Sequence, residues 1–158
     1  MTDEKKKQPG KRLFIDADSF PHLEAAIEVA ENFAIKIVAA GNITQNLGRL
    51  EGVEGLQTIE VSDGMDAADF AIINDMNAGD IVLTGDTGLA SLVLGKGGFA
   101  IDIRGNPYRE ESINGRLMTR HIGKKIRRGG GKTKGQKKIS TLDRKKFAEK
   151  LTSWLKGL

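Results

Sequence analysis

The sequence predicts an α/β protein with an open, mainly parallel, doubly wound sheet of about five strands covered by helices on both faces. The first observation is a short apolar run at residues 13–15, which lacks alternation and is typical of a strand buried on both faces. The second is that segments with helical spacing of apolar residues separate several such runs. This repeated alternation favours a doubly wound layer structure over an all-helical or all-β fold.

Five segments are predicted to form strands: residues 13–15, 35–39, 56–61, 80–84 and 99–103. Residues 56–61 alternate more than the others, so we expect this strand nearer to the edge of the sheet. Residues 41–55 are rich in Gly and Asn and have no clear period, which predicts a loop.

Three helices are predicted between these strands. The first follows residues 13–15 and has Leu23, Ala26, Ile27, Ala30 and Ala34 on one face. Ser19 can cap this helix, and Pro21 suits its first turn. Residues 66–77 and 89–96 form the other two, which glycines end.

The net charge of +4 hides an asymmetry. Acidic residues outnumber basic ones by about two to one up to residue 103, and basic residues outnumber acidic ones by about four to one after it. Residues 127–139 are expected to form a flexible basic loop. Ser140 or Thr141 then caps a final helix that packs back on the domain, with Leu142, Phe147, Leu151, Trp154 and Leu155 on its buried side.

Composition and length set the organisation that we expect. We divide the chain into a disordered leader at residues 1–11, an α/β domain at 12–126, the basic loop at 127–139 and the C-terminal helix at 140–158. The chain contains no cysteine, which excludes disulfides, thiolate metal sites and cysteine nucleophiles. No signal peptide or apolar run of membrane-spanning length is visible, so we predict a cytoplasmic protein without a membrane partner. The sequence makes no prediction about its oligomeric state.

Aspartates follow several predicted strands. Asp16 and Asp18 follow the first strand, Asp66 and Asp69 lie i, i+3 at the start of the middle helix, and Asp86 follows residues 80–84. Parallel strands end at one edge of a sheet, so these acids could gather there. Oxygen ligands favour Mg²⁺ or Mn²⁺, which would support phosphodiester hydrolysis. The alternative is that Asp86 and Asp66 only cap helices, while Asp63 and Asp80 are better explained as turn or strand-entry residues, and His22 and His121 as structural or exposed ones.

The basic end of the chain is rich in arginine, which suits bidentate phosphate contacts. The candidates are Arg104, Arg109, Arg116, Arg120, Arg127 and Arg128. Tyr108 could stack on a base, although packing at a turn also explains it. We therefore expect a nucleic-acid partner.

Several motifs together resemble the YaiI/YqxD family of uncharacterised bacterial proteins. They start at Ile15, Gly64, Gly79, Arg104, Arg116 and Asp143, and they read IDAD, GMDAAD, GDIVLTGD, RGNPY, RLMTR and DRKKF. The resemblance covers nearly everything from Leu13 to Leu155. It implies a PIN-like nuclease domain, a Rossmann-like three-layer sandwich in which acids at strand ends bind Mg²⁺ or Mn²⁺ and cleave RNA. We therefore expect RNA, before DNA, as the nucleic-acid partner. Carried over by position, Asp16, Asp66, Asp69 and Asp86 would be the metal acids, with Asp18 close by.

The sequence leaves alternative functions open. In a metal-dependent endoribonuclease, Asp16 and Asp86 would be the catalytic pair. In a non-catalytic nucleic-acid-binding protein, the acids would be caps and turns. The residues from Phe14 to Asp18 also resemble the start of haloacid-dehalogenase-type phosphatases, in which Asp16 would be the nucleophile, but the lysine that these enzymes use is missing between Lys36 and Lys96. Members of the YaiI/YqxD family often carry Ala-Cys-Pro where this chain has Ser19-Phe20-Pro21, so a cysteine mechanism is not available.

Overall fold

The computed structural model describes residues 11–17, 20–41, 56–61, 67–111, 113 and 140–158. The strands of this part form one five-stranded sheet in the order β3-β2-β1-β4-β5, and every neighbouring pair is parallel. They are β1 (Arg12–Asp16), β2 (Lys36–Gly41), β3 (Leu56–Glu60), β4 (Ile81–Leu83) and β5 (Phe99–Ile101). The predicted open, parallel α/β fold is confirmed, and so is the edge position of residues 56–61.

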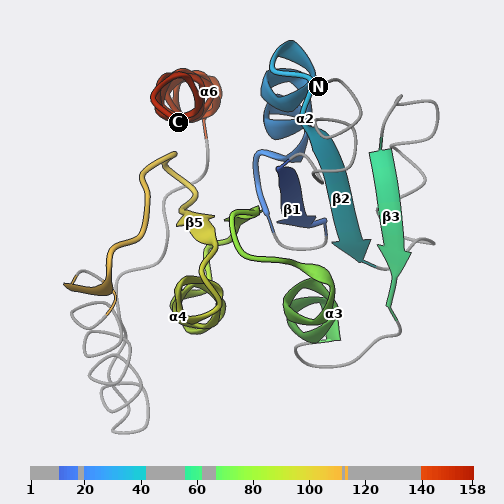
Figure 1. Cartoon of the computed structure of the whole chain (residues 1–158). Helices are drawn as coiled ribbons and strands as arrows, with labels where there is room; N and C mark the ends of the chain where they lie inside the picture. Colours follow the sequence, from blue (N-terminus) through green and yellow to red (C-terminus); the bar gives the residue numbers. More distant parts are fainter. Residues whose placement is uncertain (1–10, 18–19, 42–55, 62–66, 112, 114–139) are drawn as a thin grey trace, which may run out of the picture.

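Helices cover both faces of the sheet. One face carries α2 (Leu23–Asn32) and α6 (Thr141–Lys156), and the other carries α3 (Ala67–Asp75) and α4 (Thr87–Gly95). Figure 1 shows α2 and α6 above the strands and α3 and α4 below them. The described residues therefore form three layers.

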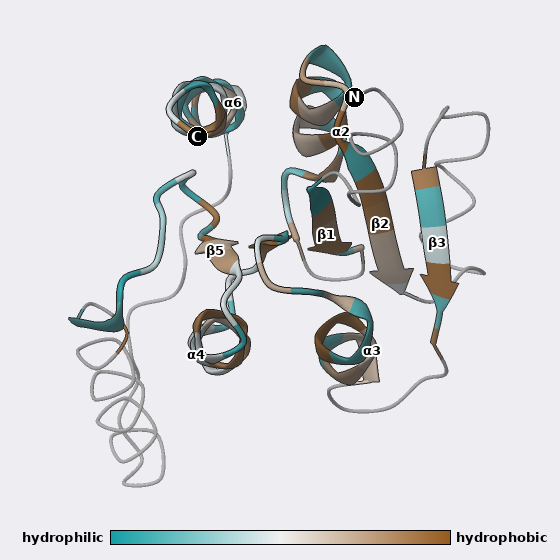
Figure 2. Cartoon of the chain, in the orientation of Figure 1, coloured by the Kyte–Doolittle hydropathy of each residue, from teal (hydrophilic) through white to brown (hydrophobic). Residues whose placement is uncertain are grey.

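Side chains of β1 alternate between two apolar cores. Leu13 and Ile15 pack with α2 and α6, whereas Phe14 packs with α3 and α4. All three are fully buried, which explains the continuous apolar run of a central strand. Figure 2 shows β1 and β2 in brown beyond their first residues, while α6 is mostly teal because only one stripe of it is buried.

The strand order gives the sheet two distinct ends. We call the side where the strands end the carboxyl edge and the side where they begin the amino edge. From β1 the chain moves outward through β2 to β3, and β4 and β5 then extend the sheet on the other side of β1. Such a reversal creates a crevice beyond the carboxyl ends of the two strands at which it occurs. Here these strands are β1 and β4.

Helix α2 differs from the prediction at both ends. It begins at Leu23 with His22 at the N-cap position, so Pro21 lies before the helix, and Ser19 is outside the described residues. It ends at Asn32, and Ala34 follows with a left-handed φ of 55°. Ile35 N donates to Ala30 O and Ala34 N donates to Glu31 O, which is a Schellman ending that rotates Ala34 off the helix.

Helix α6 confirms the predicted cap and most of the predicted buried stripe. Ser140 and Asp143 form a reciprocal capping box. Phe147, Leu151 and Leu155 are buried at i, i+4 spacing, and Trp154 packs partly against them. Leu142 was expected in this stripe but is 58% exposed, because it lies outside the i, i+4 row of the buried residues.

Three predictions fall wholly or largely on segments that the structure does not describe. They are the disordered leader, of which residues 1–10 are outside the described part, the loop at residues 42–55 and the basic loop at residues 127–139. In the rest of the chain, no helix is long and apolar enough to cross a membrane.

Candidate functional site

Asp16 is the last residue of β1, at the carboxyl edge. Its pairing partner on β2 is Ala40, which packs in the core formed with α3 and α4. Residues paired in register point to the same face of a sheet, as Phe14 and Val38 do one pair earlier on that face. Asp16 therefore belongs to the sheet face that α3 and α4 cover.

Asp69 and Asp86 lie at the same edge and on the same face. Helices α3 and α4 each follow a strand and so begin at the carboxyl edge. Asp69 is in the first turn of α3, and Asp86 is the N-cap of α4. The fold thus brings Asp16, Asp69 and Asp86 to the carboxyl edge of the sheet, on the face that α3 and α4 cover, although up to 70 residues separate them in the sequence.

Asp86 has a structural task that the sequence left as an alternative. Its Oδ1 accepts hydrogen bonds from Gly88 N at 2.8 Å and from Leu89 N at 3.4 Å, while its own backbone N donates to Thr84 Oγ1 at 2.9 Å. These bonds cap α4 and hold the corner after β4 in one conformation. Capping uses one carboxylate oxygen and leaves the charge of the group in place.

Asp18 and Asp66, the other two predicted metal ligands, lie outside the described residues. Among the residues that the structure does describe, no group of three or more His, Asp or Glu side chains is gathered as a metal cage. Magnesium does not require one, because it usually keeps several waters and binds through one or two carboxylates and substrate phosphates. The hard oxygen donors of Asp16 and Asp86 fit such an ion.

The loop after β5 adds an acid that no pattern in the sequence singled out. Asp102 is buried at the carboxyl edge, and its Oδ1 accepts from Arg104 N at 2.9 Å and from Asn106 N at 3.0 Å. Gly105 completes this tight turn with a φ of +87°. The Asp-x-x-Gly-Asn sequence is the signal that could have predicted this turn, and its role is to hold Arg104 at the surface.

Tyr108 serves packing and not base stacking. It is only 5% exposed, and its hydroxyl donates to Thr84 O at 3.0 Å. The chain after β5 is thereby tied to the end of β4, next to Asp86. Packing at a turn was one of the two explanations that the sequence allowed for Tyr108, and the structure agrees with it. The buried ring offers no face on which a base could stack.

The predicted arginines divide into two groups. Arg104 and Arg109 are exposed beyond the carboxyl end of β5. Arg116, Arg120, Arg127 and Arg128 lie outside the described residues. The described pair places positive charge beside the edge that carries Asp16 and Asp86.

Asp80 lies at the opposite, amino edge, directly before β4. It is 5% exposed and accepts three hydrogen bonds, from Arg12 N at 3.1 Å, from the Arg12 guanidinium at 3.2 Å and from Asn77 N at 2.9 Å. This pattern agrees with its interpretation as a strand-entry residue, because the carboxylate joins Arg12, the first residue of β1, to Asn77 in the segment before β4.

His22 follows β1 and is buried against α6. Its ring stacks on Phe147 at 5.0 Å between centroids, and its Nδ1 has no hydrogen-bond partner among the described residues. Burial, together with the positive charge of Arg144, lowers the pKa of His22 although Asp143 opposes the shift. His22 is therefore a structural histidine that favours its neutral form.

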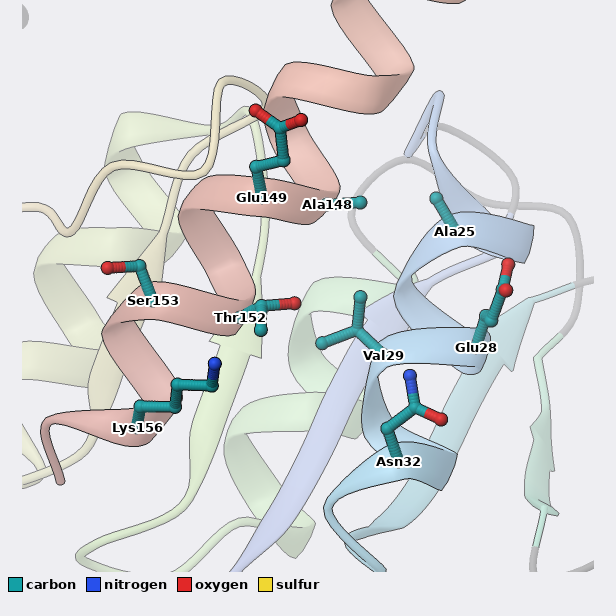
Figure 3. Close-up of a pocket in the computed structure, with 9 residues that line it drawn as sticks. All are labelled: Ala25, Glu28, Val29, Asn32, Ala148, Glu149, Thr152, Ser153 and Lys156. Atoms are coloured by element: carbon teal, nitrogen blue, oxygen red, sulfur yellow. The ribbon is translucent and has the colours of Figure 1, made fainter.

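A groove of about 410 Å³ separates α2 from α6. Figure 3 shows Val29 and Thr152 pointing toward each other across it, with Lys156 at one end. None of the acids or arginines predicted for the site lines it. This groove is thus separate from the carboxyl-edge acids.

Comparison with known proteins places the chain in a family. The family model described as "Uncharacterized BCR, YaiI/YqxD family" matches residues 14–157. A UPF0178 protein of Exiguobacterium sibiricum is 38% identical over 144 residues, covering 91% of this chain and 96% of that protein. One from Enterococcus faecalis is 37% identical over 145 residues, covering 92% and 97% respectively.

A solved structure with a similar chain can be compared as well. The crystal structure of Rae1 (YacP) from Bacillus subtilis, a W164L mutant, covers 93% of this chain and 98% of its own at 13% sequence identity and a TM-score of 0.42. The family assignment rests on the sequence matches alone. They show that this chain belongs to the YaiI/YqxD family.

Proposed function

We propose that this protein is a divalent-metal-dependent nuclease that hydrolyses phosphodiesters, with RNA as the preferred substrate over DNA. The observation that carries the proposal is the register of β1, which assigns Asp16 to the face and edge where α3 and α4 begin with Asp69 and Asp86. This is also the strand-order reversal at which open α/β sheets bind their ligands. Acids at such a position suit a hard cation better than an apolar ligand.

Asp16 and Asp86 would hold the cation, with Asp69, Asp66 and Asp18 as the further acids of the site. Mg²⁺ or Mn²⁺, when bound, polarises a phosphodiester and lowers the pKa of a bound water. The chain's own contribution is positioning. The hydrogen bonds between Thr84, Asp86 and Gly88 fix the β4 corner before any ligand arrives, and preorganised groups need no reorganisation during reaction.

The exposed arginines of the loop after β5 would contribute phosphate contacts. The backbone of Arg104 donates to the Asp102 carboxylate, and the hydrogen bond from the Tyr108 hydroxyl to Thr84 O attaches this loop to the carboxyl edge. A guanidinium contacts phosphate in a bidentate manner, so Arg104 and Arg109 would orient a phosphodiester at the edge. Arg116, Arg120, Arg127 and Arg128 would supply further phosphate contacts.

The proposal is tested by cleavage of a labelled single-stranded RNA with Mg²⁺ or Mn²⁺ and with a chelator. We expect cleavage only with metal, and a loss of roughly 100-fold in rate or more for Asp16→Asn and Asp86→Asn. Asp75→Asn, an exposed acid at the amino edge, is the matched control and should retain activity. Metal-independent cleavage, or full activity in Asp16→Asn, would refute the nuclease.

A non-catalytic nucleic-acid-binding protein is the second candidate. The capping bonds of Asp86 favour it, because they give this acid a purpose without any metal. In that case the wild type binds RNA, cleaves none with either metal, and shows the same affinity as Asp16→Asn.

The phosphatase alternative has less support. Lys36 begins β2, and Lys96 follows the end of α4, where its Nζ donates to Ile73 O. Both lysines that flank the gap in the sequence are thus at the amino edge, away from Asp16. Binding of beryllofluoride, a mimic of an aspartyl phosphate, would nevertheless favour the phosphatase over the nuclease.

A further inference from the structure

One flank of α6 faces the chain around β5. A Cβ added to Gly105 would lie 2.8 Å from Lys150 Cβ and 2.9 Å from Phe147 O, so the loop after β5 rests directly on this helix. At the other end of β5, the Phe99 ring lies 5.3 Å from the Trp154 ring. Helix α6 therefore runs from the carboxyl edge to the amino edge alongside β5, and Figure 1 shows the chain after β5 reaching α6.

Cationic and aromatic side chains lie together on this flank. Lys146, Lys150 and Trp154 share one side of α6 at i, i+4 spacing. Arg104 is exposed on the loop that contacts Lys150. Phe99, at the start of β5, is 36% exposed, and the Lys11 ammonium lies 5.6 Å from the centroid of its ring. We call these six residues the α6 track: Lys11, Phe99, Arg104, Lys146, Lys150 and Trp154.

The distribution of acids on α6 leaves the track basic. Of the two acids in this helix, Glu149 lines the groove on the α2 side. Asp143 is used in the capping box with Ser140, at the first turn. From Lys146 to Trp154 the track extends about 12 Å along the helix axis, since each residue rises 1.5 Å.

We propose that the α6 track binds single-stranded nucleic acid. The bound strand would run from the carboxyl edge, where Asp16 and Asp86 lie, along α6 toward the amino edge. Lysines and arginine on such a path neutralise successive phosphates, while exposed ring surface accepts unpaired bases. A duplex keeps its bases stacked inside and cannot use the exposed Phe99 ring, which lies beside Trp154. The inference rests on the nucleic-acid partner of the proposed function, but it does not depend on hydrolysis.

The sequence contains one tryptophan, so intrinsic fluorescence reports on Trp154 directly. The probe is an oligouridylate of about 12 nucleotides, a length within the range that one single-strand site covers. With a chelator present to prevent cleavage, we expect the oligonucleotide to quench Trp154 and to bind more weakly as salt rises. A duplex of equal length should quench far less, and equal quenching by both would overturn the proposal.

Two double variants provide a matched comparison on one helix. Lys146→Ala/Lys150→Ala removes two charges from the track, and Lys145→Ala/Lys156→Ala removes two lysines from elsewhere on α6. The track variant should bind roughly tenfold more weakly or worse, and its log–log salt slope should be shallower by about 1.4, since each phosphate contact to a single strand contributes about 0.7. The control should bind like the wild type. Equal loss in both variants would show that only net charge matters and would refute the track.

Phe99→Leu keeps an apolar side chain and removes the ring. A loss of about fivefold or more in affinity is expected, since one stacked base contributes about 1 kcal/mol or more. Unchanged affinity would contradict a role for the ring. Thermal melts of every variant show that each is folded before it is compared.

The two proposals fail in different ways. If the wild type binds the oligonucleotide through the track but never cleaves RNA with either metal, the nuclease is wrong and the track stands. If it cleaves RNA while Lys146→Ala/Lys150→Ala binds and quenches like the wild type, the track is wrong and the nuclease stands.

Discussion

Asp80 at the amino edge of the sheet is held differently from Asp16 and Asp86 at the carboxyl edge. At the amino edge, Asp80 is buried, and its carboxylate accepts from two backbone amides and one guanidinium. At the carboxyl edge, Asp16 ends the central strand and Asp86 caps a helix beside the strand-order reversal. The comparison teaches that the local sequence of an acid near a strand does not reveal its role. The role follows from the edge of the sheet at which the acid lies and from the groups that donate hydrogen bonds to it.

The largest expected effect is at the amino edge. Asp80→Ala removes the shared acceptor of Arg12 and Asn77, and we expect the free energy of unfolding to fall by about 3 kcal/mol. Asp75 contacts the same Arg12 guanidinium but is half-exposed, so Asp75→Ala should cost less than about 1 kcal/mol. Urea unfolding measures both values, and similar losses in the two variants would contradict a special role for Asp80.

Asp86 allows capping to be separated from charge. Asparagine caps helices as well as aspartate does, so Asp86→Asn should change stability by less than about 0.5 kcal/mol, whereas Asp86→Ala should lose about 1 kcal/mol. Both variants should fail to respond to Mg²⁺ or Mn²⁺. If Asp86→Asn kept the full metal response, the carboxylate would serve only as a cap, and the contrast between the edges would disappear.

His22 adds a pH dependence near the carboxyl edge. Because burial lowers its pKa in the folded protein, the unfolded chain takes up a proton more readily below pH 6.5. The His22 contribution to stability is therefore complete above pH 6.5 and is lost as the pH falls toward the lowered folded value.

His22→Phe tests this linkage. The phenyl ring can keep the stacking with Phe147 and removes the unpartnered Nδ1. Urea unfolding above and below pH 6.5 should show a smaller decrease in stability for the variant than for the wild type. Identical pH profiles would show that His22 does not cause the decrease.

The smallest expected effect is at Ala34, where α2 turns toward β2 at the amino edge. Its φ of 55° is strained for alanine by about 1 kcal/mol. Ala34→Gly should remove this strain. The net gain in the free energy of unfolding should be only a few tenths of a kcal/mol, because the greater entropy of glycine in the unfolded chain offsets most of the relief. A lower melting temperature for the variant would contradict this interpretation of the Schellman ending.

Hydrophobic pattern predicted the strands because each of them obeys a local rule. The run from Leu13 to Ile15 is apolar because β1 is central, and residues 56–61 alternate because β3 is at the edge. Ala34 and Leu142 were assigned to helical faces by spacing alone. A Schellman ending moved the first off its helix, and the second lies outside the row that packs on the sheet.

The site was less predictable, because its features depend on distant parts of the chain. The strand order brings Asp16 beside the corner of Asp86, and no local pattern specifies that order. Tyr108 is buried because its hydroxyl reaches Thr84 O, 24 residues away in the sequence. Likewise, the α6 track exists only because the loop at Gly105 packs on Lys150.

The most direct test of the carboxyl edge is the thermal shift on metal addition. A ligand that binds only the folded state raises its melting temperature with concentration. We predict that Mg²⁺ or Mn²⁺ raises the melting temperature of the wild type and of Asp75→Asn, but not that of Asp16→Asn/Asp86→Asn, in which the α4 cap is retained. An unchanged wild-type melting temperature, or an equal rise in the double variant, would contradict a metal site at this edge.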